Sequence, residues 1–131
     1  MEYIVGITFA AAVSLFASMI GLDRDRAFYP TVLIVIALLY ALFSFLGTDP
    51  RVLASEAIPI LIFITLAVLG FKKSAWFAVA GLVGHGIFDF FHADAIHNDG
   101  VPSWWPGFCL AYDVVAGGYL AGMLLRARTA G

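Results

Sequence analysis

The chain has 131 residues, of which 63% are hydrophobic and only 12% charged, and its mean hydropathy is +0.98. A soluble domain is about half apolar and about a quarter charged, so this composition is typical of an integral membrane protein. The net charge of -2, without any run of Lys or Arg, excludes a basic surface for nucleic acid, and the single cysteine excludes a disulfide within the chain.

Five apolar segments are long enough, or nearly so, to cross a bilayer, which takes about 20 mostly apolar residues in a helix. In chain order they are residues 3–22, 28–46, 53–71, 75–92 and 106–125. The first has no basic region before it and no small-residue cleavage site after it, so we interpret it as a span and not as a signal peptide. We therefore predict an all-α fold, a polytopic bundle of five transmembrane helices that forms one integral membrane domain over residues 1–131.

The basic residues predict how this bundle is oriented. With five spans, one side of the membrane receives the basic residues of the first and third connections and of the C-terminal tail, which are Arg24, Arg26, Lys72, Lys73, Arg126 and Arg128. Only Arg51 falls on the other side. Because Lys and Arg accumulate on the cytoplasmic side, we predict that the N-terminus is outside and the C-terminus is cytoplasmic. Four spans would scatter the same residues over both faces.

Ionisable residues inside the spans concentrate toward the predicted outer side. His85, Asp89 and His92 stand at positions i, i+4 and i+7 of the fourth span, within about 60° of one another on a helix, and so form one stripe. Asp113 lies in the first turns of the fifth span, and Glu56 lies in the first turn of the third. Three helices thus deliver imidazoles and carboxylates to the same slab of the bilayer.

We interpret an ionisable side chain within a span as a candidate functional residue, because burying such a group in lipid is costly. Imidazole and carboxylate groups suit a divalent metal ion such as zinc or iron. The candidate ligands for one or two ions are His85, Asp89, His92, Asp113 and Glu56. In a hydrolase, Asp89 or Glu56 would also be the candidate catalytic base. An oxidoreductase with a di-metal carboxylate site would use an overlapping set of ligands.

The same residues allow two other interpretations. They could form a proton or ion relay without catalysis, although the inner halves of the spans carry no charge with which to continue such a path. They could also form a structural polar network that only holds three helices together. For Cys109, one turn before Asp113, we favour a packing role over a ligand role.

Small and aromatic residues suggest further contacts. Two sets of glycines, Gly118 with Gly122 and Gly81 with Gly84 and Gly86, let membrane helices approach closely, either inside one bundle, which we favour, or at a homo-oligomer seam. Trp104 and Trp105 fit an interfacial aromatic belt, or a lid over the polar site. The expected partners are membrane lipids and an apolar small-molecule substrate.

The series Glu56, His85-x3-Asp89-x2-His92 and Cys109-x3-Asp113 resembles a family of small, uncharacterised bacterial inner-membrane proteins. The likeness covers residues 56–113; where the family often has a second histidine, this chain has Ala93. The resemblance implies a multi-pass protein of the bacterial inner membrane with a shared polar site, and it implies no particular reaction.

Overall fold

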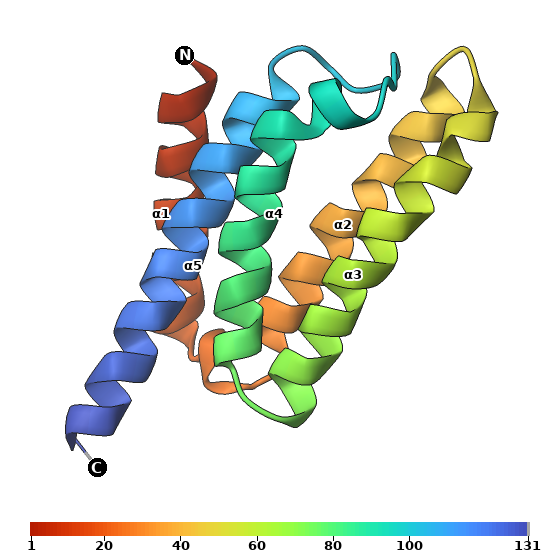
Figure 1. The fold of residues 1–131 in the computed structure, drawn as a ribbon. Helices are drawn as coiled ribbons and strands as arrows, with labels where there is room; N and C mark the ends of the chain where they lie inside the picture. The colour runs from red at the N-terminus through yellow and green to blue at the C-terminus, as the bar shows by residue number, and fades with distance from the viewer. Residues whose placement is uncertain (131) are drawn as a thin grey trace.

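The computed structural model describes the backbone of residues 1–130 and the side chains of residues 1–128. Five long helices follow one another, and residues 1–130 contain no strand, so the all-α prediction is confirmed. The helices are α1 (Glu2–Ile20), α2 (Phe28–Leu46), α3 (Leu53–Lys72), α4 (Trp76–Ala95) and α5 (Trp105–Ala130) (Figure 1). Their positions closely follow the apolar segments of the sequence, except that α5 continues beyond the predicted end.

The helices form two groups that meet at α4. Helix α1 packs on α5 and α5 packs on α4, whereas α2 packs on α3 and α3 packs on α4. Figure 1 shows α2 and α3 leaning away from α1 toward the end of the molecule that carries the N-terminus. Helix α4 therefore has neighbours from both groups, and its side chains occupy the middle of the bundle.

Short connections between the helices follow local turn chemistry. Helix α1 ends at Gly21, whose φ of 81° is the left-handed conformation that glycine adopts without strain. Between α2 and α3, Asp49 accepts a hydrogen bond from the backbone N–H of Arg51 and begins a short 3-10 turn, Pro50–Val52. Such brief turns return each helix antiparallel to the one before.

Four of the five helices are long and apolar enough to cross a membrane: Glu2–Ile20, Phe28–Leu46, α3 with its preceding turn (Pro50–Lys72), and Trp105–Arg128. Their outward faces carry large apolar side chains, such as Met19 and Ile58, that are 84% and 66% exposed. Apolar exposure over whole helices is expected where lipid is the solvent. Helix α4 is not among the four, since its His and Asp side chains and its glycines make it less apolar.

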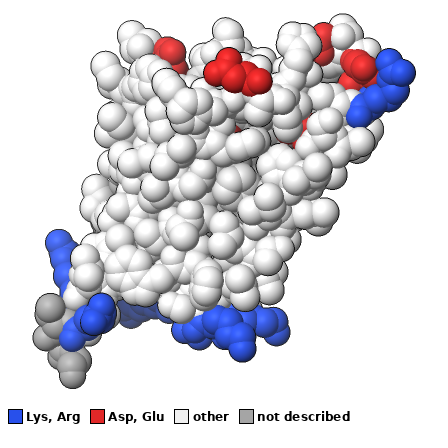
Figure 2. Space-filling view, viewed as in Figure 1, with Lys and Arg blue, Asp and Glu red and all other residues white. Residues whose placement is uncertain are grey.

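Charge divides the molecule along the helix axes. Figure 2 shows Lys and Arg gathered at one end of the bundle, with Asp and Glu visible at the opposite end beside one basic group. The first end holds the α1–α2 connection, the α3–α4 connection and the end of α5 (Figure 1). Arg51, in the α2–α3 connection, lies at the other end.

Glycines bring α4 close to its neighbours. A Cβ added at Gly81 would overlap a side chain of α2, and one at Gly86 would press on α5. The prediction that Gly118 and Gly122 pack inside the bundle is wrong, because a Cβ at either position would meet no described atom within 4 Å. Gly117 makes the close contact to α4 instead, so the face of α5 that packs on α4 does not include Gly118 or Gly122.

Candidate metal centre

The polar stripe of α4 faces the interior of the bundle. His85 and Asp89 are completely buried, and His92 is 2% exposed. Glu56 of α3 and Asp113 of α5 are also completely buried, one on each side of α4. All five candidate ligands therefore lie in the interior, and each carboxylate from a neighbouring helix meets a different histidine.

The first group, which we call the trio, consists of His85, Asp89 and Asp113. His85 Nδ1 lies 2.7 Å from Asp113 Oδ2, which is a hydrogen bond between α4 and α5. The same nitrogen lies 3.2 Å from Asp89 Oδ2, one turn further along α4. One potential ligand atom from each of the three residues lies within 4.8 Å of the other two.

Each member of the trio has a buried polar atom without a hydrogen-bond partner among the described residues. These atoms are His85 Nε2, Asp89 Oδ2 and Asp113 Oδ1. Buried polar atoms are nearly always paired, because leaving one unpaired costs about 1–3 kcal/mol. Three neighbouring side chains that each have such an atom indicate capacity for a further polar or charged group.

Aromatic side chains hold the trio in place. The Tyr40 hydroxyl of α2 donates to Asp89 Oδ1 over 2.5 Å, and this fixes the carboxylate that His85 approaches. The rings of Phe63 and His85 pack edge to face, with their centres 4.8 Å apart. The Tyr40 ring also stacks on His92, with centres 4.2 Å apart, so it connects the trio to the second histidine.

The second group, which we call the pair, consists of His92 and Glu56. His92 Nε2 lies 2.8 Å from Glu56 Oε1, and Asn98 Nδ2 donates to the same oxygen over 2.9 Å. Glu56 Oε2 has no hydrogen-bond partner among the described residues. The structure thus divides the five predicted ligands into a trio that shares one centre and a pair that is already hydrogen-bonded.

Sequence reasoning missed both Tyr40 and Asn98, and the sequence Asn98-Asp99-Gly100 is typical only of a turn. In the sequence, Tyr40 is one of many aromatic residues in an apolar segment. The nearest polar residue of that segment is Ser44, one helical turn later. Asn98 does form the turn, accepting the backbone N–H of Gly100, but its amide also reaches Glu56 and Ser44. A side chain that forms a turn and also donates a hydrogen bond to a buried carboxylate gives no distinct sequence pattern.

The connections at the end of the molecule that carries the N-terminus are joined by polar contacts. Asp99 accepts the backbone N–H of Thr48 over 2.9 Å and also the Thr48 hydroxyl, which ties the α4–α5 connection to the α2–α3 connection. These bonds lower the pKa of Asp99, because they stabilise its charged form. Trp105 is half-buried against Phe43, with ring centres 5.1 Å apart, whereas Trp104 is 51% exposed.

The charges and distances of the trio suit a divalent cation. A protonated His85 would neutralise only one of the two carboxylates, which leaves a net negative charge in a low-dielectric interior. A divalent ion beside neutral His85 and two carboxylates gives a neutral set. With metal–ligand bonds of about 2.0–2.2 Å, neighbouring ligand atoms lie about 3.0–3.5 Å apart. His85 Nδ1 lies 2.7 Å from Asp113 Oδ2 and 3.2 Å from Asp89 Oδ2, so an ion bound by these three atoms would replace the hydrogen bond between His85 and Asp113.

Comparisons of the chain with protein-family models, with curated proteins and with solved structures found no match. The likeness to a family of bacterial inner-membrane proteins stays a prediction from the motif. The function of the site is therefore inferred from its own geometry and chemistry.

Proposed function

We propose that this is an integral membrane protein that binds a divalent metal ion, zinc or iron, through His85, Asp89 and Asp113. The observation that carries this proposal is the convergence of these three side chains, which are all completely buried and carry an excess of negative charge. Each of them also has a buried polar atom without a hydrogen-bond partner among the described residues. Three protein ligands also leave room for a water or substrate atom, as in catalytic zinc sites.

We place the protein in the bacterial inner membrane with five crossings, the N-terminus outside and the C-terminus cytoplasmic. Helix α4 is less apolar than the others, but it lies between them and its His85, Asp89 and His92 side chains are buried, so it need not expose them to lipid. The basic end of the molecule then faces the cytoplasm (Figure 2). A periplasm-dependent reporter fused to the C-terminus should be inactive, and an active reporter would refute this orientation.

The pair has a different role in this proposal. His92 and Glu56 bind each other and so fix α3 against α4 beside the metal centre. Glu56 Oε2 is a buried carboxylate oxygen without a partner among the described residues, which makes Glu56 the candidate acid or base. Asp89 is held by Tyr40 and serves as a ligand.

A bound metal ion would supply Lewis-acid activation of a substrate oxygen or of water. The protein's own contribution is to exclude bulk water, since every member of the trio is fully buried, and to hold both carboxylates in fixed orientations. A site enclosed by lipid-facing helices suits a lipid or another apolar substrate.

Metal analysis of the protein purified in mild detergent without chelators tests the proposal. The wild type should contain about one metal ion per chain, and His85→Ala and Asp113→Ala should both lose it. Asp99→Asn is the matched control, because it removes an exposed carboxylate at the same end of the molecule and should leave the metal content unchanged. A metal-free wild type, or equal metal in the wild type and Asp113→Ala, would overturn the proposal.

A further inference from the structure

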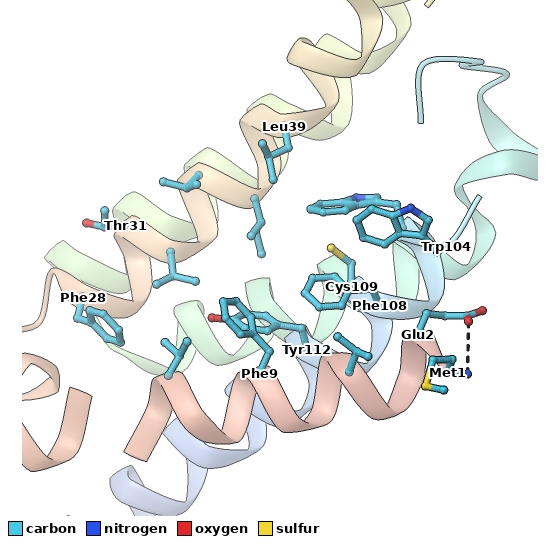
Figure 3. Close-up of a pocket in the computed structure, with 16 residues that line it drawn as sticks. Met1, Glu2, Phe9, Phe28, Thr31, Leu39, Trp104, Phe108, Cys109 and Tyr112 are labelled. Carbon is cyan, nitrogen blue, oxygen red and sulfur yellow. Dashed lines mark ion pairs between the residues drawn. The ribbon is translucent and has the colours of Figure 1, made fainter. Parts of the chain in front are cut away.

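An apolar groove opens on the side of the bundle between α1 and α2. Its cavity volume is about 1000 Å³, and α1, α2 and the beginning of α5 form its walls. Figure 3 shows Phe9 and Tyr112 pointing into the space, with Phe28 at one end of it and Trp104 and Glu2 at the other. The groove exists because α2 packs on α3 and leans away from α1 (Figure 1).

The length of the groove matches one leaflet of a bilayer. On α1, its lining extends from Glu2 to Val13, which is about 17 Å at 1.5 Å per residue. Half of a hydrocarbon core of about 30 Å is about 15 Å. The volume lies at the upper end of the range of about 300–1,000 Å³ for ligand pockets, so the groove is larger than a gap between packed helices requires.

The groove is mostly apolar along its length, and the one charged side chain among its described lining residues, Glu2, stands at one end. Its walls carry aliphatic and aromatic side chains, whereas Glu2 and the Trp104 indole lie at the end where the acidic residues gather (Figures 2 and 3). Tryptophan at that depth is typical of the bilayer interface. A molecule with a hydrocarbon chain and a polar end fits this distribution, with its chain between the helices and its polar end at the interface.

Cys109 joins the groove to the metal centre. Its side chain lines the groove, although the residue is only 1% exposed. Cys109 stands one helical turn before Asp113 on α5, and Asp113 is a member of the trio. A hydrocarbon chain in the groove would therefore lie one helical turn from the trio.

We propose that the groove holds the hydrocarbon chain of a membrane phospholipid from the outer leaflet and presents it to the buried trio beside Cys109. A phospholipid would then be the substrate of the metal centre, and in that respect the inference rests on the proposed function. Lipid binding itself is measurable without reference to metal.

Two positions of α2 provide a matched test. Val35 lines the groove and Leu38 does not, yet both are apolar and about half exposed, at 53% and 46%. Lipid-stripped protein in detergent micelles is titrated with dioleoyl phosphatidylcholine, and bound lipid is counted by native mass spectrometry. The wild type and Leu38→Phe should bind one lipid per chain, whereas Val35→Phe should bind at least about fivefold more weakly, because extra bulk in a filled site is costly.

Val13→Phe blocks the groove from the opposite wall and should weaken binding in the same way, which keeps the test valid if one variant fails to fold. Equal binding by all four proteins, or no retained lipid in the wild type, would overturn the proposal. Metal content measured in the same samples separates the two claims. Lipid bound without metal would refute only the metal centre, and metal bound without lipid would refute only the groove.

Discussion

Replacing Glu56 by alanine tests how the five buried groups divide between the pair and the trio. The substitution removes the carboxylate oxygen that lies 2.8 Å from His92 Nε2 and accepts the Asn98 amide over 2.9 Å. Each donor left unpaired costs about 1–3 kcal/mol, and two give about 2–6 kcal/mol. Breaking a buried ion pair costs about 3–5 kcal/mol. We therefore expect Glu56→Ala to lower the free energy of unfolding by about 3–5 kcal/mol.

Glu56→Gln is the matched control, because its amide oxygen still accepts one of the two hydrogen bonds. We expect this variant to lose about 1–3 kcal/mol, which is the cost of one imperfectly paired group. The measurement is equilibrium unfolding of purified protein in mixed micelles, with metal content determined on the same preparations. Both variants should keep their metal wherever they remain folded.

Two results would refute this division of the site. If Glu56→Ala is as stable as the wild type, the hydrogen bonds of the pair do not hold α3 against α4. If folded Glu56→Ala loses metal as completely as Asp113→Ala, Glu56 is a ligand and the pair and the trio form one centre.

Three further predictions concern single substitutions. Tyr40→Phe removes the hydrogen bond to Asp89. It should weaken metal binding by about 10–100-fold in a metal titration, since groups that orient metal ligands have effects of that size. Unchanged affinity would count against Asp89 as a ligand. Gly117→Ala should lower the free energy of unfolding by about 1–3 kcal/mol, because its Cβ would overlap α4. The Cβ of Gly118→Ala meets no described atom, so this variant should be neutral or slightly stabilising. Equal effects of the two substitutions would contradict the α4–α5 packing. The pKa of Asp99 is lowered by hydrogen bonds from the α2–α3 connection, so its contribution to stability is present above its ordinary pKa and is lost as the pH falls through the lowered value. The wild type should therefore unfold at a higher temperature than Asp99→Asn near pH 6, with a smaller difference near pH 3; a constant difference would contradict that role.

The positions of the helices could be predicted because the apolar segments are interrupted by short polar connections at regular intervals. Helix α5 runs further than predicted, to Ala130, since the alanine and arginine residues after position 125 favour helix even though they are not apolar. The spacing of His85, Asp89 and His92 also predicts a single face of α4, and the structure buries that face.

The partners within the site could not be predicted, because spacing along one helix gives an angle but not the offset of the neighbouring helix. Asp113 reaches His85 because Gly86 lets α5 approach α4 closely. Glu56 meets His92 because the two helices are antiparallel, so that the beginning of α3 lies at the same end of the molecule as the end of α4. The same limitation explains the error at Gly118, since a small-residue pattern does not reveal which glycine faces a neighbour.

The central claim is that His85, Asp89 and Asp113 hold one metal ion. X-ray absorption spectroscopy of the wild-type protein, purified without chelators, tests it most directly because the spectrum reports the atoms bound to the metal. We predict a coordination shell of nitrogen and oxygen atoms at about 2.0–2.2 Å, with the scattering pattern of one imidazole and no sulfur. A metal-free protein, or a sulfur neighbour at about 2.3 Å contributed by Cys109, would contradict the assignment.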